Sequence, residues 1–178
     1  MARFSVTSIF NSIKPVPKPP VMIPEQVWRD PRYFIAFGLG SGAMPFAPGT
    51  FGTLMAIPFY LLLRPLPILI YILFTIAFIA FSSWLCQKIS DEIKVSDHVG
   101  MCIDEFAGFF VTMIGAPAGV SWIILGFLLF RFFDICKPWP IRKIDNSMHS
   151  GFGMVLDDVV AGIFALVVLQ IIYFLCTV

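Results

Sequence analysis

The chain consists of long apolar runs separated by short polar intervals, which is the pattern of helices that cross a membrane. Residues 68–86 and 159–178 each match the roughly 20 apolar residues that a helix needs to span a bilayer. A third apolar region is divided by the turn sequence APAG, which predicts two shorter helices, 106–115 and 120–130. We therefore expect an all-α, polytopic helical membrane protein with several transmembrane or re-entrant helices.

Residues 38–53, GLGSGAMPFAPGTFGT, interrupt this apolar pattern with glycine and proline. These residue types predict a tight loop with accessible backbone N–H groups, which can hold a phosphate. The hydroxyl side chains that could add donors to such a loop are Ser41, Thr50 and Thr53. A hinge that lets helices pack closely explains the same composition. The apolar segment that follows, residues 53–63, is short and contains Pro58, so we expect at most a partly re-entrant helix there.

The first 33 residues differ from the rest and form a separate N-terminal arm, before a membrane domain at 34–178. Residues 1–13 suit either a short interfacial helix or an irregular segment, and the proline-rich residues 14–24 predict an extended spacer. Residues 27–33 combine aromatic and basic side chains, as segments at a membrane surface do.

Composition supports the membrane interpretation and removes several function classes. Hydrophobic residues make up 58% of the chain and charged residues 13%, whereas soluble proteins carry about 25% charge. The net charge of +1 and the lack of a recognisable module argue against a nucleic-acid partner. The four cysteines form no metal-binding or disulfide pattern, and no signal peptide precedes the chain. No feature sets an oligomeric state.

Charged residues divide unequally between the two sides of such a membrane domain. With an even number of crossings before residue 88 and again between 106 and 130, eleven of the twelve Lys and Arg residues fall on one side. Every Asp, Glu and His falls there too, and only Arg64 lies on the other side. The positive-inside rule places the charged side in the cytoplasm and the C-terminus opposite. All candidate chemistry then gathers at one cytoplasmic face.

Two charged clusters flank the apolar runs on that face, where charges are costly unless they pair or bind something. Arg131 and Asp134 share one face of a helix that Pro138 and Pro140 should stop, which leaves Lys137 at its end. The acidic pairs that abut apolar runs are Asp104–Glu105 and Asp157–Asp158. The second pair suits either a site or a plain helix N-terminal cap. Together the clusters predict a site for a divalent metal and a phosphate.

Most other polar side chains are expected on the solvated surface and not in the site. Asp91, Glu92, Lys94 and Asp145 fit a solvated face, and His149 fits a surface loop. His98 lies close enough to Asp104 in sequence to remain a secondary candidate for the site.

Four sequence blocks occur in an order and spacing that resemble the phosphatidylglycerophosphatase A family. They are GSGAMPFAPGTFGT, IDEFAG, FRFFDICKPWPI and GMVLDDVVAG, and the resemblance covers residues 34–178. It implies an Mg²⁺-dependent phosphatase of the bacterial cytoplasmic (inner) membrane that converts phosphatidylglycerophosphate to phosphatidylglycerol and phosphate in phospholipid biosynthesis. The functional polar residues that it implies are Asp104, Glu105, Arg131, Asp134, Lys137, Asp157 and Asp158.

The residue chemistry is compatible with that activity. The carboxylates of Asp104, Glu105, Asp134, Asp157 and Asp158 are the hard oxygen ligands that Mg²⁺ prefers, and we expect them to lack matching protein cations. One of them could orient or deprotonate the attacking water. Arg131 can bind phosphate with two N–H groups, and Lys137 adds a point charge.

Two alternatives come from other classes. A CDP-alcohol phosphotransferase is also an acidic Mg²⁺ membrane enzyme, but its paired DG and AR motifs are missing here. A small transporter or scaffold should carry its charges within the spans, whereas here they lie at the ends.

Overall fold

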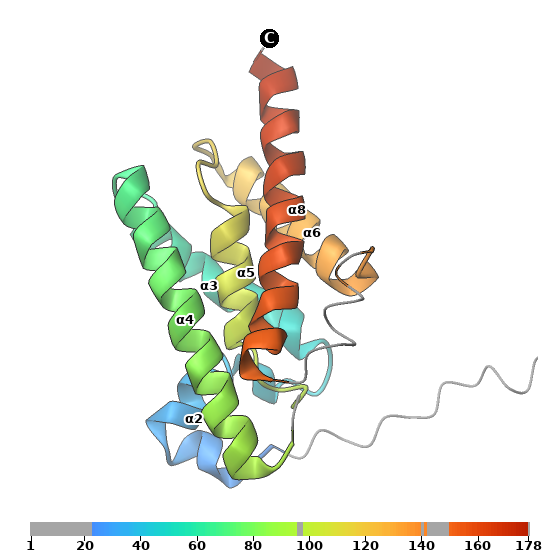
Figure 1. Ribbon diagram of the computed structural model, residues 1–178. Coiled ribbons are helices and arrows are strands. Elements are labelled where there is room, and N and C mark those ends of the chain that lie inside the picture. Colours follow the sequence, from blue (N-terminus) through green and yellow to red (C-terminus); the bar gives the residue numbers. More distant parts are fainter. Residues whose placement is uncertain (1–22, 96–97, 140, 142–149, 178) are drawn as a thin grey trace, which may run out of the picture.

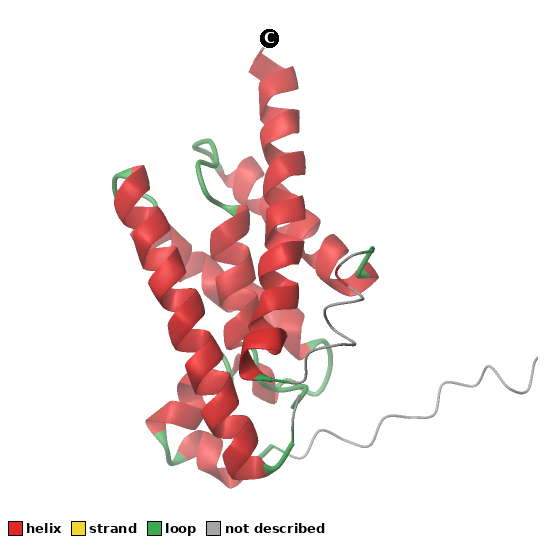
Figure 2. Ribbon diagram, in the orientation of Figure 1, coloured by secondary structure: helices red, strands yellow, loops and turns green. Residues whose placement is uncertain are grey.

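The computed structural model describes residues 23–95, 98–139, 141 and 150–177. Regular structure in this part of the chain is entirely helical, which confirms the predicted all-α class there (Figure 2). The predictions for residues 1–22 of the N-terminal arm, and those for Asp145 and His149, concern residues outside the described part.

The described residues form two short 3-10 helices and six α-helices. The elements are η2 (Glu25–Trp28), α2 (Pro31–Ala36), η3 (Ser41–Ala43), α3 (Pro48–Leu63), α4 (Ile68–Ile93), α5 (Ile103–Thr112), α6 (Val120–Cys136) and α8 (Gly151–Thr177).

Helix α5 lies at the centre of the bundle and packs against α8, α3, α4 and α6 (Figure 1). Every residue of α5 is buried except the two acids of its first turn. Glycines allow the contact with α8 to be close, because a Cβ atom on Gly162 would overlap the Gly108 carbonyl oxygen. The carbonyls that follow α5 accept hydrogen bonds from Gln170 of α8, at 3.1 Å each. Gln170 thus satisfies two backbone carbonyls just beyond the end of this short helix.

Helices α3 and α4 form one antiparallel pair, α5 and α6 form a second, and α8 runs antiparallel to α4 (Figure 1). The backbone N–H of Gly151 at the start of α8 donates a 2.7 Å hydrogen bond to Gln87 Oε1 on the last part of α4. The polar end of α4 and the beginning of α8 therefore lie together. The α3–α4 turn that contains Arg64 lies at the opposite end of the bundle.

Helices α4 and α8 are long and apolar enough to cross a membrane by length and composition. Only 22% of the most apolar window of each is buried inside the protein, whereas the core helix of a soluble protein is mostly buried. Large apolar side chains such as Leu69 and Phe174 are 65% exposed. These observations suggest a membrane-associated protein.

Several expected boundaries are wrong. Helix α3 begins at Pro48 and continues through Pro58, so the loop ends earlier than residue 53. Proline suits the first turn of a helix, and a later proline is tolerated where neighbouring helices hold the segment. Helix α4 extends beyond residue 86 to Ile93, since its polar last turns pack against α2 and α8. Helix α5 begins at Ile103 and ends at Thr112, earlier than predicted.

Candidate active site

Three carboxylates meet where the first turn of α5 packs against α8. Asp104, Glu105 and Asp158 each offer one oxygen, and these three atoms lie within 4.8 Å of one another. Helix α8 begins at Gly151, so Asp157 and Asp158 lie about two turns inside it. Both are buried, at 7% and 4% exposure, and the alternative that they merely cap the helix is therefore wrong.

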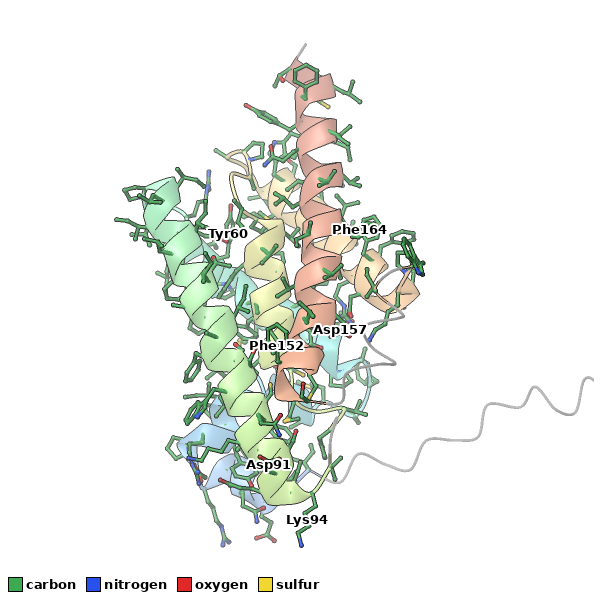
Figure 3. The ribbon with its side chains drawn as sticks, in the orientation of Figure 1. Tyr60, Asp91, Lys94, Phe152, Asp157 and Phe164 are labelled. Atoms are coloured by element: carbon green, nitrogen blue, oxygen red, sulfur yellow. The ribbon has the colours of Figure 1, made fainter. Side chains whose placement is uncertain are left out.

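The acidic cluster is set back from the polar end of the bundle. Figure 3 shows Asp157 on α8 well above Asp91 and Lys94, which mark the end of α4. Gly151 and Asp158 are seven residues apart, which corresponds to about 10 Å along the helix axis. A substrate must therefore reach into the bundle rather than rest on its end.

Arg131 links α6 to the cluster. Its Nη1 atom lies 2.6 Å from Asp134 Oδ2 and 3.9 Å from Glu105 Oε1, and the side chains of all three are at most 14% exposed. The prediction that Arg131 and Asp134 share one helix face is confirmed, and the two side chains form an ion pair. Among the described residues, Arg131 Nε and Glu105 Oε2 are buried without a hydrogen-bond partner. Buried groups of this kind are costly unless a ligand completes them.

Lys137 and Asp157 form a second buried contact beside the cluster. Lys137 follows the last residue of α6, as predicted, and its Nζ atom lies 2.6 Å from Asp157 Oδ2. Three of the five expected ligand carboxylates thus have a cation nearby, since Asp134 and Glu105 share Arg131 and Asp157 has Lys137. The expectation that all five lack such partners is wrong, because the chain folds Arg131 and Lys137 onto the acids that sequence spacing kept separate.

Burial has a clear electrostatic effect on Glu105. Loss of solvation, followed by the neighbouring Asp158, raises the pKa of Glu105 from 4.5 to about 8. A side-chain hydrogen bond with Asp104 lowers the pKa of Glu105 but does not offset the effect of burial. The site therefore favours an added positive charge.

Gly49, near the start of α3, is a site residue that sequence reasoning missed. A Cβ atom at this position would overlap Glu105 Oε1 and would lie 3.1 Å from both terminal nitrogens of Arg131. The positively polarised start of α3 consequently lies against the Glu105–Arg131 pair. The dipeptide Pro48–Gly49 within the predicted loop was the signal that could have identified it.

The predicted hydroxyl donors do not gather at this point. Ser41 Oγ donates to the Gly38 carbonyl at 2.7 Å, and Thr53 Oγ1 donates to the Gly49 carbonyl at 2.9 Å. Both hydroxyls therefore hold backbone in place. Thr50 is half-buried and directly follows Gly49, the residue that borders the charged pair.

Two other polar predictions have a clear outcome. Glu92 is more than a solvated side chain, because it accepts hydrogen bonds from Arg32 at 2.9 Å and from the Tyr33 hydroxyl at 3.1 Å. His98 accepts a 3.1 Å hydrogen bond from the Gly100 amide and packs against the Phe37 ring. These contacts attach α2 to α4 and order the loop before α5.

Sequence comparison places the chain in a known family. The sequence model for Phosphatidylglycerophosphatase A matches residues 34–173, well over half of the chain. The chain belongs to the phosphatidylglycerophosphatase A family. The resemblance of the four sequence blocks is thereby confirmed.

Individual relatives cover most of the family domain. Phosphatidylglycerophosphatase A of Escherichia coli is 40% identical over 135 residues, which is 75% of this chain and 78% of the relative. The Haemophilus influenzae protein of the same name is 41% identical over 141 residues, 78% of this chain and 86% of the relative. A Bacteroides thetaiotaomicron relative, provisionally named as a phosphatidylinositol-3-phosphatase, is 35% identical over 150 residues, 77% of this chain and 90% of the relative. No solved structure matches the chain.

Proposed function

We propose that this chain hydrolyses the terminal phosphomonoester of phosphatidylglycerophosphate to phosphatidylglycerol and phosphate, a step of phospholipid biosynthesis. Family membership and the names of two relatives support this activity. The observation that carries it is the buried group of Asp104, Glu105 and Asp158 beside Arg131. A phosphomonoester dianion needs charge neutralisation and positioning more than covalent chemistry, and this group supplies both.

Mg²⁺ is the proposed cofactor, and the donor set fits it. Three carboxylate oxygens within 4.8 Å of one another are hard ligands, and Glu105 Oε2 is buried without a hydrogen-bond partner in the described structure. Asp104, Glu105 and Asp158 would hold the ion. When bound, Mg²⁺ would neutralise phosphate charge and make a bound water more acidic.

The remaining residues then have distinct roles. Arg131 donates to the phosphate, since its Nε–H is buried without a partner while Asp134 fixes the guanidinium from one side. Gly49 leaves room for a phosphate oxygen beside this guanidinium and the start of α3. Lys137 adds positive charge and is held by Asp157. A carboxylate that does not bind Mg²⁺ tightly orients the attacking water.

The proposed localisation is the bacterial inner membrane, with several crossings and the site facing the cytoplasm. Supporting this, the polar last turns of α4 lie beside the start of α8, whereas the α3–α4 turn with Arg64 lies at the other end of the bundle (Figure 1). The positive-inside rule assigns the charged end to the cytoplasm.

Phosphate release from defined lipids tests the proposal. Purified protein in detergent should release phosphate from phosphatidylglycerophosphate with Mg²⁺, and should lose this activity in excess EDTA. Phosphatidate, lysophosphatidate and phosphatidylinositol 3-phosphate are the competing substrates, the last chosen because of the Bacteroides thetaiotaomicron relative. Asp91→Asn is the matched control, because Asp91 is exposed and remote from the cluster. Equal turnover of all four lipids would contradict the proposed specificity. Full activity in excess EDTA would contradict the proposed need for Mg²⁺.

A further inference from the structure

An apolar groove lies on the side of α5 that faces away from the acidic cluster. It has a volume of about 300 Å³, and every residue that lines it is apolar. Phe59 and Leu62 come from α3, Phe74 and Phe78 from α4, and Ile103 and Phe110 from α5. Ile103 and Phe110 are seven residues apart, so the groove follows α5 for about 10 Å.

The mouth of the groove opens between α3 and α4, where a bilayer would surround the protein. Leu62 is 74% exposed, Phe74 40% and Phe59 38%. Helix α4 is long and apolar enough to span the membrane. The groove would therefore face hydrocarbon, and its wholly apolar lining suits an acyl chain.

Arg64 supplies the polar feature at one end of this groove. It directly follows the groove-lining Leu63, and it is exposed at the end of the bundle opposite the catalytic cluster. In the described part of the chain, no ion pair or hydrogen bond joins its guanidinium to an acidic side chain. An exposed arginine at a membrane surface can bind a lipid phosphate.

We propose that this groove holds one acyl chain of an anionic phospholipid from the leaflet opposite the active site, with Arg64 binding that lipid's phosphate. A second copy of the chain is a poorer occupant. The α3–α4 turn, the α5–α6 connection and the last turns of α8 contain no Asp or Glu, so a parallel copy brings no carboxylate to meet Arg64. A phospholipid brings a phosphate and an acyl chain together.

Native mass spectrometry of protein released from nanodiscs tests this binding. Nanodiscs of equal phosphatidylglycerol and phosphatidylcholine should yield wild-type protein with one retained phosphatidylglycerol, preferred about tenfold, as one charge-assisted hydrogen bond provides. Arg64→Gln should keep one lipid but lose the preference. Leu63→Trp should fill the groove and lose the lipid, whereas the control Leu61→Trp should keep it, because Leu61 is exposed outside the groove.

Phosphate release by the same variants keeps the outcomes separate. Leu63 and Arg64 lie far from the acidic cluster, so both variants should turn over phosphatidylglycerophosphate at the wild-type rate, which also reports correct folding. Equal lipid retention by Leu63→Trp and Leu61→Trp would overturn the proposal, as would wild-type protein that retains no lipid or both lipids equally. A wild-type dimer that Leu63→Trp dissociates without change in bound lipid would instead assign the groove to a second copy. Wild-type protein that retains the lipid but releases no phosphate would refute the proposed function and leave the lipid site standing.

Discussion

Gly49→Ala tests the site at the position where the structure leaves least room. The added Cβ atom overlaps Glu105 Oε1 and lies 3.1 Å from both Nη atoms of Arg131. Ordinary van der Waals separation requires the carboxylate to retreat by on the order of 1 Å. A misplacement of that size in a catalytic group costs about 10²-fold in rate, or about 2.7 kcal/mol of transition-state stabilisation.

Stability should respond far less than activity. Alanine is a better helix former than glycine by about 0.5–1 kcal/mol, which offsets part of the strain at the start of α3. We therefore expect kcat/KM for phosphatidylglycerophosphate to fall about 10²-fold while the unfolding temperature in detergent changes little.

Gly126→Ala is the matched control for this experiment. Gly126 is also a helical glycine, and it lies on a part of α6 remote from the cluster. A Cβ atom added there would meet the flexible thioether of Met113. This variant should retain wild-type kcat/KM. If Gly49→Ala folds normally and keeps kcat/KM within a few-fold of wild type, Gly49 does not border the reacting phosphate and the assignment of the site is wrong.

Four further predictions concern the charged residues and the topology. Asp158→Asn should lower kcat by at least ~10²-fold with the fold intact, because it removes a proposed metal ligand. Asp157→Asn should instead lower the free energy of unfolding by about 1–3 kcal/mol, measured by denaturation in detergent, since it removes the partner of a lysine that is 27% exposed. In EDTA, thermal stability should decline as pH rises from about 4.5 towards 8, because the unfolded chain releases the Glu105 proton while the folded protein, with its raised pKa, retains it. Glu105→Gln should flatten that decline, and an unchanged slope would contradict the assigned pKa. In intact cells, an impermeant thiol reagent should label Leu66→Cys but not Asp91→Cys in a cysteine-free background, and the reverse result would invert the proposed topology.

Much of the architecture follows from local properties of the sequence. The apolar runs specify α4 and α8, because a helix that faces lipid must be apolar over its length whatever its neighbours are. The spacing of Arg131 and Asp134 specifies their pairing, since residues three apart share a helix face. Proline after Lys137 ends α6 for an equally local reason. These features depend on chain stereochemistry and solvation, which a sequence expresses directly.

Which charges meet depended on tertiary structure. The five carboxylates looked equivalent in the sequence, yet the fold pairs Asp134 and Asp157 with cations and leaves Asp104, Glu105 and Asp158 together. The close packing of α5 against α8 produces that division, and it rests on Gly108 and Gly162, which are far apart in the chain. The same distance in sequence hid the contact of Gly49 with Glu105 and Arg131, because a residue without a side chain carries no chemical signal of its own. Long-range packing of helices sets these separations, and a local pattern of residues contains no record of them.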